Sequence, residues 1–479
     1  MVPGGEAGWE LDEFCVASRF PMAAMIRYPD MKSTTLFRNA TLVNEGETTE
    51  QDLLVVNGRI EQINSDIPAP TGAEIVAAEG LHLLPGVIDD QVHFREPGMT
   101  HKGNIFTESR AAIAGGVTSF MDMPNTRPTT TTHAELAKKH EVAAKNAAAN
   151  YGFYFGATND NIAQIRTLDP SMVCGVKIFM GASTGNMLVD DEQTLATIFN
   201  DCPVVITTHC ESTPIIQRNL EVARQKYGAN IPITEHPVIR STQACYVSTE
   251  LAVGLARTYD AQLHVLHISS AKELDLFEPG PMQGKSVTAE TCIHFLHFTD
   301  QDYPEYGNLI KCNPAIKGEP DRLALIEALN NGRIDIIATD HAPHTLEEKS
   351  LDDYLQAPSG LPLIQDVLLA SLELVHDGSL DLPALVQLMS HNPATRFGVL
   401  ERGFLREGFA ADLVLVDLEA GTTIRRDKVL SRCGWSPFEG RTFKSRIHST
   451  WVNGMLAFDG DTVIEHGAAQ ALTYFRERR

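Results

Sequence analysis

Short apolar runs alternate with helix-like segments through the middle of the chain, and 132–150 and 321–331 are examples of the latter. The eight apolar runs lie at 83–94, 117–123, 151–157, 174–180, 203–209, 262–268, 285–292 and 334–340. Eight strands alternating with helices over about 310 residues are typical of a closed parallel barrel. The pattern therefore predicts an α/β fold with a (β/α)8 barrel over 86–395. A doubly wound open sheet is the alternative, but no G-x-G-x-x-G motif follows an early strand.

Both ends of the chain have the pattern of short β-strands. β-rich runs fill 35–85 and 396–479, and Asn-Gly pairs at 57–58 and 453–454 lie between apolar stretches, as in tight hairpins. We therefore expect the N- and C-terminal segments to combine into one small β-sandwich. Residues 1–34 show no such periodicity and lack the basic and then apolar order of a secretory signal. This stretch is interpreted as a disordered extension without a function.

Composition narrows the classes of function. The 479 residues include 39 Lys+Arg and 62 Asp+Glu, a formal net charge of −23, and 43% hydrophobic residues. This hydrophobic content can bury a substantial core, whereas the acidic balance argues against a protein that binds nucleic acid. No run nears the roughly 18 apolar residues of a membrane span. Eight cysteines without a C-x-x-C pair favour a reducing compartment. We expect a cytoplasmic protein with a small-molecule substrate and with neither nucleic acid nor a membrane as partner.

Side chains with metal-binding chemistry lie where several predicted strands end. In such a barrel the carboxyl ends of the strands open onto one mouth, where active sites collect. Five strand ends supply Gln91 and His93, Lys177, His209, His267, and Asp340. A single histidine at a strand end is more often a hydrogen-bonded structural residue, but chance explains five such strand ends poorly. Because imidazole and carboxylate suit Zn²⁺, or else Mn²⁺, Fe²⁺ or Co²⁺, the pattern predicts a hydrolytic metal centre.

Lys177 stands inside an apolar run, between Val176 and Ile178. An unpaired ammonium group is costly to bury, so this lysine should face the cavity, pair with an acid, or be chemically altered. Carboxylation of its amine by CO₂ would make it an anionic bridging ligand.

Five motifs together resemble a known family. In chain order they are PGVIDDQVHFREPG, AGGVTSFMDMPNT, THCES, LHISS and ATDHAPH. Over about residues 35 to 460 the chain resembles the dihydroorotases of the amidohydrolase superfamily. The resemblance implies a barrel with one or two zinc ions and a composite β-sandwich. It also implies the reversible, metal-dependent cyclisation of N-carbamoyl-L-aspartate to L-dihydroorotate in pyrimidine (UMP) biosynthesis. A homo-oligomer would be usual for the superfamily, and association with aspartate transcarbamoylase is a further partner to consider.

The resemblance assigns roles residue by residue. The metal ligands would be His93, a carboxylated Lys177, His209, His267 and Asp340. Asp340 would also be the catalytic acid–base. His267 is preferred to His264 because it fits the V-L-H-I-S-S pattern. The two histidines alternate on an ideal strand, so at most one should face the barrel axis.

The remaining roles concern the substrate. Arg95, Asn125 and His344 would hold the substrate carboxylate, and Asn313 would lie against the pyrimidine ring. Allantoinases, hydantoinases and dihydropyrimidinases have similar metal ligands but act on substrates that mostly lack a ring carboxylate. These enzymes have less use for Arg95, Asn125 and His344, so the presence of these three residues favours a dihydroorotase. In the expected reaction the metal activates water, Asp340 moves the proton, and Arg95 clamps the carboxylate.

One position departs from the family's pattern. The usual first motif is H-x-H, and this chain has Gln91-Val92-His93. A glutamine carbonyl is neutral and a weaker zinc ligand than imidazole. Three outcomes stay open: a binuclear centre with one weak ligand, a mononuclear centre, or a non-catalytic scaffold, against which the intact remainder of the set argues. The adjacent Asp89 and Asp90 are interpreted as groups that cap or hydrogen-bond at the strand end.

Overall fold

A computed structural model describes residues 33–181 and 187–476, which belong to one compact unit, Lys32–Arg479. The predicted extension 1–34 lies outside the described residues except for its last two. The domain boundaries predicted at residues 35, 86 and 396 stay predictions, because the barrel and the terminal strands share this unit.

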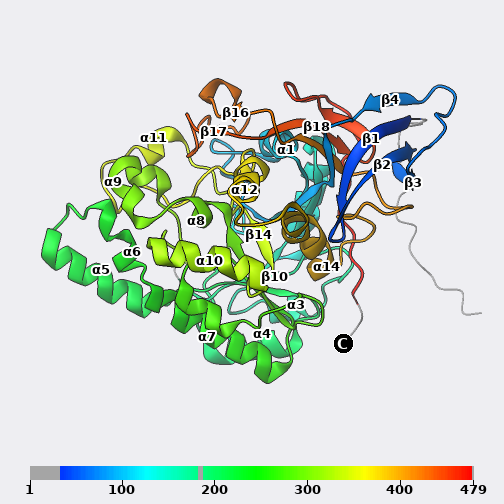
Figure 1. The fold of residues 1–479 in the computed structure, drawn as a ribbon. Helices are drawn as coiled ribbons and strands as arrows, with labels where there is room; N and C mark the ends of the chain where they lie inside the picture. Colours follow the sequence, from blue (N-terminus) through cyan, green and yellow to red (C-terminus); the bar gives the residue numbers. More distant parts are fainter. Residues whose placement is uncertain (1–32, 182–186, 477–479) are drawn as a thin grey trace, which may run out of the picture. The chain divides into compact units, whose positions relative to one another are not determined.

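Eight parallel strands form a closed barrel (Figure 1). Tyr154 interrupts the third strand and divides it into β8 and β9. In chain order the elements are β6 (Val87–Val92), β7 (Val117–Asp122), β8 (Asn150–Phe153), β9 (Phe155–Gly156), β10 (Val176–Phe179), β11 (Ile206–His209), β12 (Leu263–Val265), β13 (Val287–Cys292) and β14 (Ile336–Ala338). A parallel bridge between Val92 and His341 joins the last strand to the first. The predicted (β/α)8 barrel is confirmed, and each of the eight apolar runs contains one of its strands.

The Asp89 side chain also joins the first and last strands of the barrel. Its Oδ2 accepts a hydrogen bond from the Thr339 hydroxyl at 2.5 Å, and its Oδ1 accepts the amide hydrogens of Gln91 and Thr339. Burial raises the pKa of this carboxyl to about 7. Asp89 is thus the hydrogen-bonding group that the sequence predicts at this strand end.

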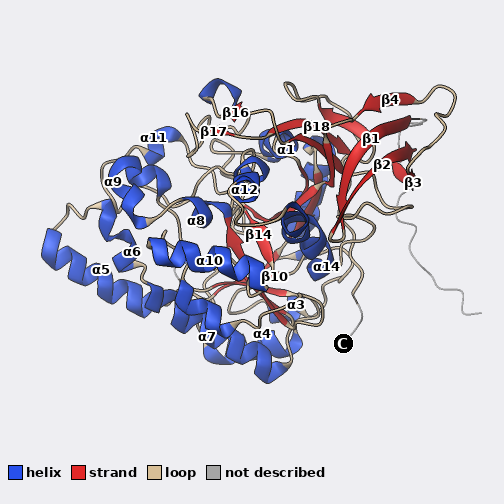
Figure 2. Ribbon diagram, in the orientation of Figure 1, coloured by secondary structure: helices blue, strands red, loops and turns tan. Residues whose placement is uncertain are grey.

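Helices surround the barrel strands (Figure 2). They are α1 (Ile105–Ala114), α2 (His133–Asn146), α3 (Ile162–Ile165), α4 (Glu192–Asp201), α5 (Thr213–Tyr227), α6 (His236–Ile239), α7 (Thr242–Tyr259), α8 (Ile293–His297), α9 (Tyr303–Tyr306), α10 (Glu319–Asn331), α11 (Leu346–Lys349), α12 (Val367–His376), α13 (Leu382–Val386) and α14 (Asn392–Phe397). Local sequence sets their starts: before α1, the Asn104 side chain accepts the Thr107 amide hydrogen at 2.8 Å and so satisfies a free donor of the first turn. No helix among the described residues is long and apolar enough to cross a membrane.

Strands from both ends of the chain share one eight-stranded sheet. They are β1 (Thr34–Asn44), β2 (Glu47–Val56), β3 (Arg59–Asn64), β4 (Glu74–Ala77), β5 (His82–Pro85), β15 (Leu413–Asp417), β18 (Arg446–Val452) and β19 (Met455–Phe458), while β16 (Thr422–Thr423) pairs separately with β17 (Thr442–Phe443). Antiparallel pairing of β5 with β15 joins the two ends, as predicted. Both Asn-Gly pairs have positive φ at each residue, as a tight hairpin turn requires. The two turns touch, because a Cβ on Gly454 would lie 2.6 Å from the Gly58 Cα.

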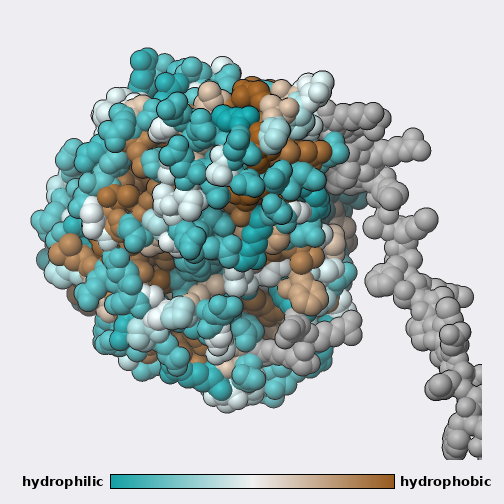
Figure 3. Space-filling model, turned by 45° about the vertical axis from the view of Figure 1, so that its right-hand side comes forward, coloured by the Kyte–Doolittle hydropathy of each residue, from teal (hydrophilic) through white to brown (hydrophobic). Residues whose placement is uncertain are grey.

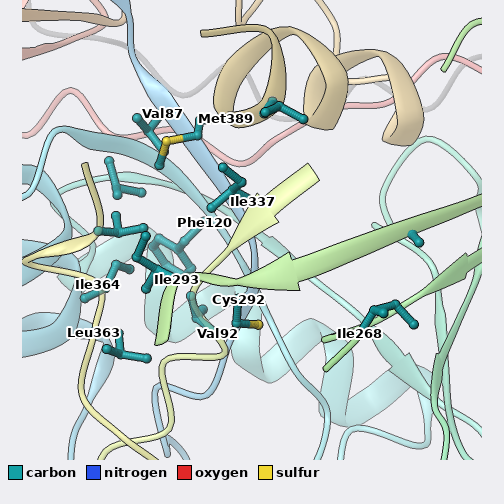
Figure 4. Close-up of a cluster of buried hydrophobic side chains, with 14 of the residues drawn as sticks. Val87, Val92, Phe120, Ile268, Cys292, Ile293, Ile337, Leu363, Ile364 and Met389 are labelled. Atoms are coloured by element: carbon teal, nitrogen blue, oxygen red, sulfur yellow. The ribbon is translucent and has the colours of Figure 1, made fainter. Parts of the chain in front are cut away.

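The main core lies between the barrel strands and the surrounding helices. Figure 4 shows Val92 of β6, Phe120 of β7 and Ile337 of β14 buried together with Cys292 of β13. The seven cysteines of the described residues are buried and unbridged, in agreement with reduced thiols. On the outside, hydrophilic side chains predominate on the face in Figure 3, and hydrophobic ones form scattered patches.

Candidate active site

The carboxyl ends of the barrel strands bring the predicted metal ligands together in two groups. The first group contains Gln91 and His93 from β6 and Asp340, which follows β14. The Nε2 atom of His93 lies 3.1 Å from Oδ1 of Asp340, and Gln91 Nε2 donates to the same oxygen at 3.2 Å. His93 Nδ1 lies 2.7 Å from Oδ1 of Asn125. An amide oxygen accepts, so Nδ1 carries a hydrogen, and Nε2 is the nitrogen that faces Asp340.

Asp340 is kept ionised by its surroundings. Burial by itself would raise the pKa of this carboxyl, but His93 and Lys177 outweigh burial and hold the pKa below its usual value. A buried, ionised carboxylate can bind a metal or accept a proton.

The second group contains His209, the last residue of β11, and His267, which follows β12. Nδ1 of His209 lies 2.9 Å from Nε2 of His267. Glu211 accepts from Nε2 of His209 at 3.0 Å and is itself paired with Arg240, so Nδ1 of His209 is left with its lone pair. Burial lowers the pKa of both histidines and favours their neutral forms. Two facing imidazole nitrogens either share one hydrogen or bind one cation, so this pair can hold a metal ion.

Lys177 of β10 lies close to both groups. It is 1% exposed, and no carboxylate of the described residues is within 4 Å of its Nζ. Burial lowers the pKa of the amine to about 8, although Asp340 and Glu290 act in the opposite direction. The charge of Lys177 also lowers the pKa of His209 and His267.

Cationic groups gather on the Arg95 side of the mouth. Arg95 is buried, donates from Nε to the Pro343 carbonyl at 3.0 Å, and places Nη2 3.0 Å from Nε2 of His344. Burial lowers its pKa to about 10. Lys102 Nζ lies 2.9 Å from Nδ1 of His344 and 3.0 Å from the Glu348 carboxylate. Burial, Arg95 and Lys102 together hold the pKa of His344 well below its usual value.

The two predicted asparagines have different environments. Asn125 contacts His93, so in this structure it orients a metal-ligand candidate. Asn313 precedes a cis-proline, and its Oδ1 is buried without a hydrogen-bond partner among the described residues. The carbonyl of the nearby Lys311 accepts the Gly360 amide hydrogen, which ties this loop to the segment beside His344.

Three of the candidate residues have left-handed backbone conformations. φ is 67° at Arg95, 44° at His267 and 49° at Asp340. Non-glycine residues adopt this region at a cost, and such strain concentrates at functional sites. The strained turns aim these side chains into the mouth just beyond the strand ends.

One expectation about the sixth strand is wrong. His264 and His267 were expected on opposite faces, but both side chains lie inside the barrel. The reason is that β12 ends at Val265 and the left-handed turn at His267 resets the alternation. Asp90 also departs from its interpretation, because its carboxylate caps nothing and instead contacts His264 at 3.3 Å.

Several residues at or near the mouth are not evident from the sequence. They are Lys102, Glu211, Arg240, Glu290 and His294. Glu211 stands two positions after His209 in THCES, and this spacing was a usable signal. His294 is buried near Asp340 and helps to lower the pKa of that carboxyl.

Comparison with known proteins agrees with this geometry. The Amidohydrolase family pattern matches residues 259–457. An allantoinase from Deinococcus radiodurans is 33% identical over 435 residues, covering 88% of this chain and 95% of the relative. A dihydroorotase from Halobacterium salinarum is 34% identical over 431 residues, covering 86% and 97%. The solved structure of an L-hydantoinase (dihydropyrimidinase) from Arthrobacter aurescens superposes with a TM-score of 0.86 at 27% identity, covering 92% of this chain and 99% of that one. The chain therefore belongs to the amidohydrolase family, as a cyclic amide hydrolase.

Proposed function

We propose that this protein is a dihydroorotase, which interconverts N-carbamoyl-L-aspartate and L-dihydroorotate in pyrimidine biosynthesis. The main support for this proposal is the cationic side of the mouth. Arg95 is buried there, and no carboxylate of the described residues lies within 4 Å of its guanidinium group. Burying an unpaired charge is costly, so an anionic ligand completes this environment. Dihydroorotate carries a ring carboxylate, and a guanidinium fork binds a carboxylate with two charge-assisted hydrogen bonds.

The residues at the mouth fit zinc as the cofactor. His209 faces His267 at 2.9 Å, and His93 faces Asp340 at 3.1 Å. These separations suit ligand atoms that share one ion at about 2.0–2.2 Å from each. Lys177 has an amine with a lowered pKa near both pairs. Its carboxylated form would add an anionic bridging group, and Gln91 would contribute at most a weak carbonyl ligand.

The chain's own residues account for substrate positioning and proton transfer. Bound zinc would supply Lewis acidity toward the ring carbonyl and lower the pKa of water. Asp340 accepts the proton of the attacking water as the new C–O bond forms, and it returns this proton to the ring nitrogen as the C–N bond breaks. Arg95 and His344 hold the ring carboxylate, which fixes the carbonyl carbon in the mouth. Ring closure uses the same groups in reverse order.

An allantoinase is the second candidate, since the allantoinase from D. radiodurans is similar over 88% of this chain. The two proposals differ in whether the cationic side of the mouth binds a carboxylate of the substrate. If it holds a carboxylate, 5,6-dihydrouracil, which has the same ring without that group, should be a much poorer substrate.

The test compares the zinc-supplemented protein with Arg95→Gln on L-dihydroorotate, 5,6-dihydrouracil, hydantoin and allantoin. We expect Arg95→Gln to lower kcat/KM for dihydroorotate by roughly 10²-fold and to leave activity on neutral rings little changed. Arg425→Gln is the matched control, because Arg425 is exposed and pairs with the exposed Asp427. Turnover of allantoin but not of dihydroorotate would overturn the proposal, and no turnover of any ring would indicate a scaffold.

A further inference from the structure

Three ionisable side chains meet inside the barrel, next to the mouth. Asp90 comes from β6, His264 from β12 and Glu290 from β13, and all three are fully buried. His264 Nε2 lies 3.1 Å from Oε2 of Glu290 and 3.3 Å from Oδ2 of Asp90. β6 is not hydrogen-bonded to β12 or β13, so these residues meet across the barrel interior. Asp90 precedes Gln91 and His93 of β6, and His264 precedes His267, which places the cluster on the inner side of the mouth.

The hydrogen bonds around His264 define what its ring can offer. Nδ1 lies 2.8 Å from Oγ1 of Thr288, whose hydroxyl has the Leu263 carbonyl as an acceptor at 3.4 Å. With the hydroxyl hydrogen directed to that carbonyl, Oγ1 can accept the Nδ1 hydrogen, which leaves the Nε2 lone pair available to a cation bound between the two carboxylates. This outer hydrogen bond is the one that a metal-binding histidine ordinarily makes.

The two carboxylates lack a positive partner. Glu290 Oε1 accepts the His267 amide hydrogen at 3.2 Å, so one of its oxygens is oriented from outside the cluster. Neither oxygen of Asp90 has a hydrogen-bond partner among the described residues. No lysine or arginine of the described chain lies within 4 Å of either carboxylate. Burial and the neighbouring Asp90 raise the pKa of Glu290 well above its usual value, so the metal-free cluster holds a proton at Glu290, which a bound cation would displace.

We propose that Asp90, His264 and Glu290 hold a divalent transition-metal ion, distinct from the metal at the mouth. One imidazole nitrogen and two carboxylate oxygens suit Zn²⁺ or Mn²⁺, and two carboxylates balance a charge of 2+. The imidazole nitrogen lies 3.1 and 3.3 Å from the two carboxylate oxygens and all three atoms lie within 4.8 Å of one another, so small shifts would let them share an ion about 2.0–2.2 Å from each. The ion would tie three strands together across the barrel. Through Glu290 it would also steady the strained backbone at His267, a ligand candidate of the mouth.

The first measurement is metal content per chain by mass spectrometry on the full chain, after dialysis in metal-free buffer. The double variant His93→Ala/His209→Ala removes ligands of the mouth without touching the three interior residues. We expect this variant to keep about one metal ion per chain, and adding Asp90→Asn to reduce the content to below about a tenth. The matched control adds Asp366→Asn instead, which neutralises a buried carboxyl outside the cluster and should leave the metal in place.

A crystal structure of the wild-type protein, with anomalous diffraction at the metal's absorption edge, keeps the proposal testable if a variant does not fold. We expect an anomalous peak between Asp90 Oδ2, His264 Nε2 and Glu290 Oε2. Any of three results would overturn the interior site. They are a His93→Ala/His209→Ala variant without metal, a metal content that Asp90→Asn does not change, and a wild-type map without an anomalous peak at this position. These results report the content and position of the metal, whereas the proposed function is tested by turnover, so this inference and the proposed function fail separately.

Discussion

Lys102 Nζ lies 2.9 Å from Nδ1 of His344, on the ring nitrogen that Arg95 does not face. An ammonium group can only donate, so with Nδ1 accepting, Nε2 holds the hydrogen, which faces the Ser359 carbonyl at 3.1 Å and cannot accept from Arg95. Nη2 of Arg95 lies 3.0 Å from the same Nε2. Donor groups therefore converge at this side of the mouth, as a carboxylate site requires.

Replacing Lys102 tests this arrangement. Lys102→Met removes the charge and the hydrogen bond that orients His344, so KM for L-dihydroorotate should rise roughly tenfold or more, with a smaller change in kcat. Steady-state kinetics measure both constants. Lys138→Met is the control, because Lys138 is exposed and pairs with Glu135. An unchanged KM would show that Lys102 has no part in carboxylate binding.

Gln91→His restores the second imidazole of the H-x-H motif. The added ligand beside Asp340 should strengthen metal binding roughly tenfold or more, because imidazole is a better zinc ligand than an amide carbonyl. Competition with a chromogenic chelator measures the affinity. If the affinity does not change, Gln91 does not contribute to the metal site.

Lys177 should link metal uptake to bicarbonate and pH. Burial lowers the pKa of its amine from 10.5 to about 8, so the neutral form that reacts with CO₂ becomes dominant above about pH 8. Zinc uptake by chelator-stripped protein should therefore require bicarbonate and should increase as the pH rises through about 8. Lys177→Met should show no bicarbonate response, and the same uptake with and without bicarbonate in the wild type would rule out carboxylation.

The buried carboxyl of Asp366 should make the free energy of unfolding depend on pH. Burial raises the pKa of this carboxyl from 3.8 to about 6, against the effect of the Ser436 hydroxyl that donates to it at 2.5 Å. The folded state thus binds the proton more tightly than the unfolded state, so the group lowers the free energy of unfolding as the pH rises from about 4 through 6.

Asp366→Asn stays neutral at every pH. Relative to the wild type, it should gain on the order of 3 kcal/mol of unfolding free energy at pH 8 and about half of that at pH 5. Urea denaturation at both pH values measures the difference. Asp427→Asn, at an exposed carboxylate, should show no such gain. A gain of equal size at both pH values would contradict the assignment.

The sequence predicts the barrel and the mouth well because both follow from short-range patterns. Each apolar run became a strand, and the ligand types after five of them converge at one end. The interior cluster could not be predicted, since Asp90 and His264 meet across the barrel and strict alternation fails where β12 ends at Val265. The sequence also does not indicate the contact of Lys102 with His344, because the two residues are 242 positions apart.

The mouth of the barrel should accept a ring that carries a carboxylate. The most direct measurement is the ratio of kcat/KM for L-dihydroorotate to that for 5,6-dihydrouracil with the zinc-supplemented wild-type protein, before and after a chelator is added. We expect a ratio of at least about 10² and loss of both activities with the chelator. A ratio near one, or ring opening that the chelator does not affect, would contradict the account.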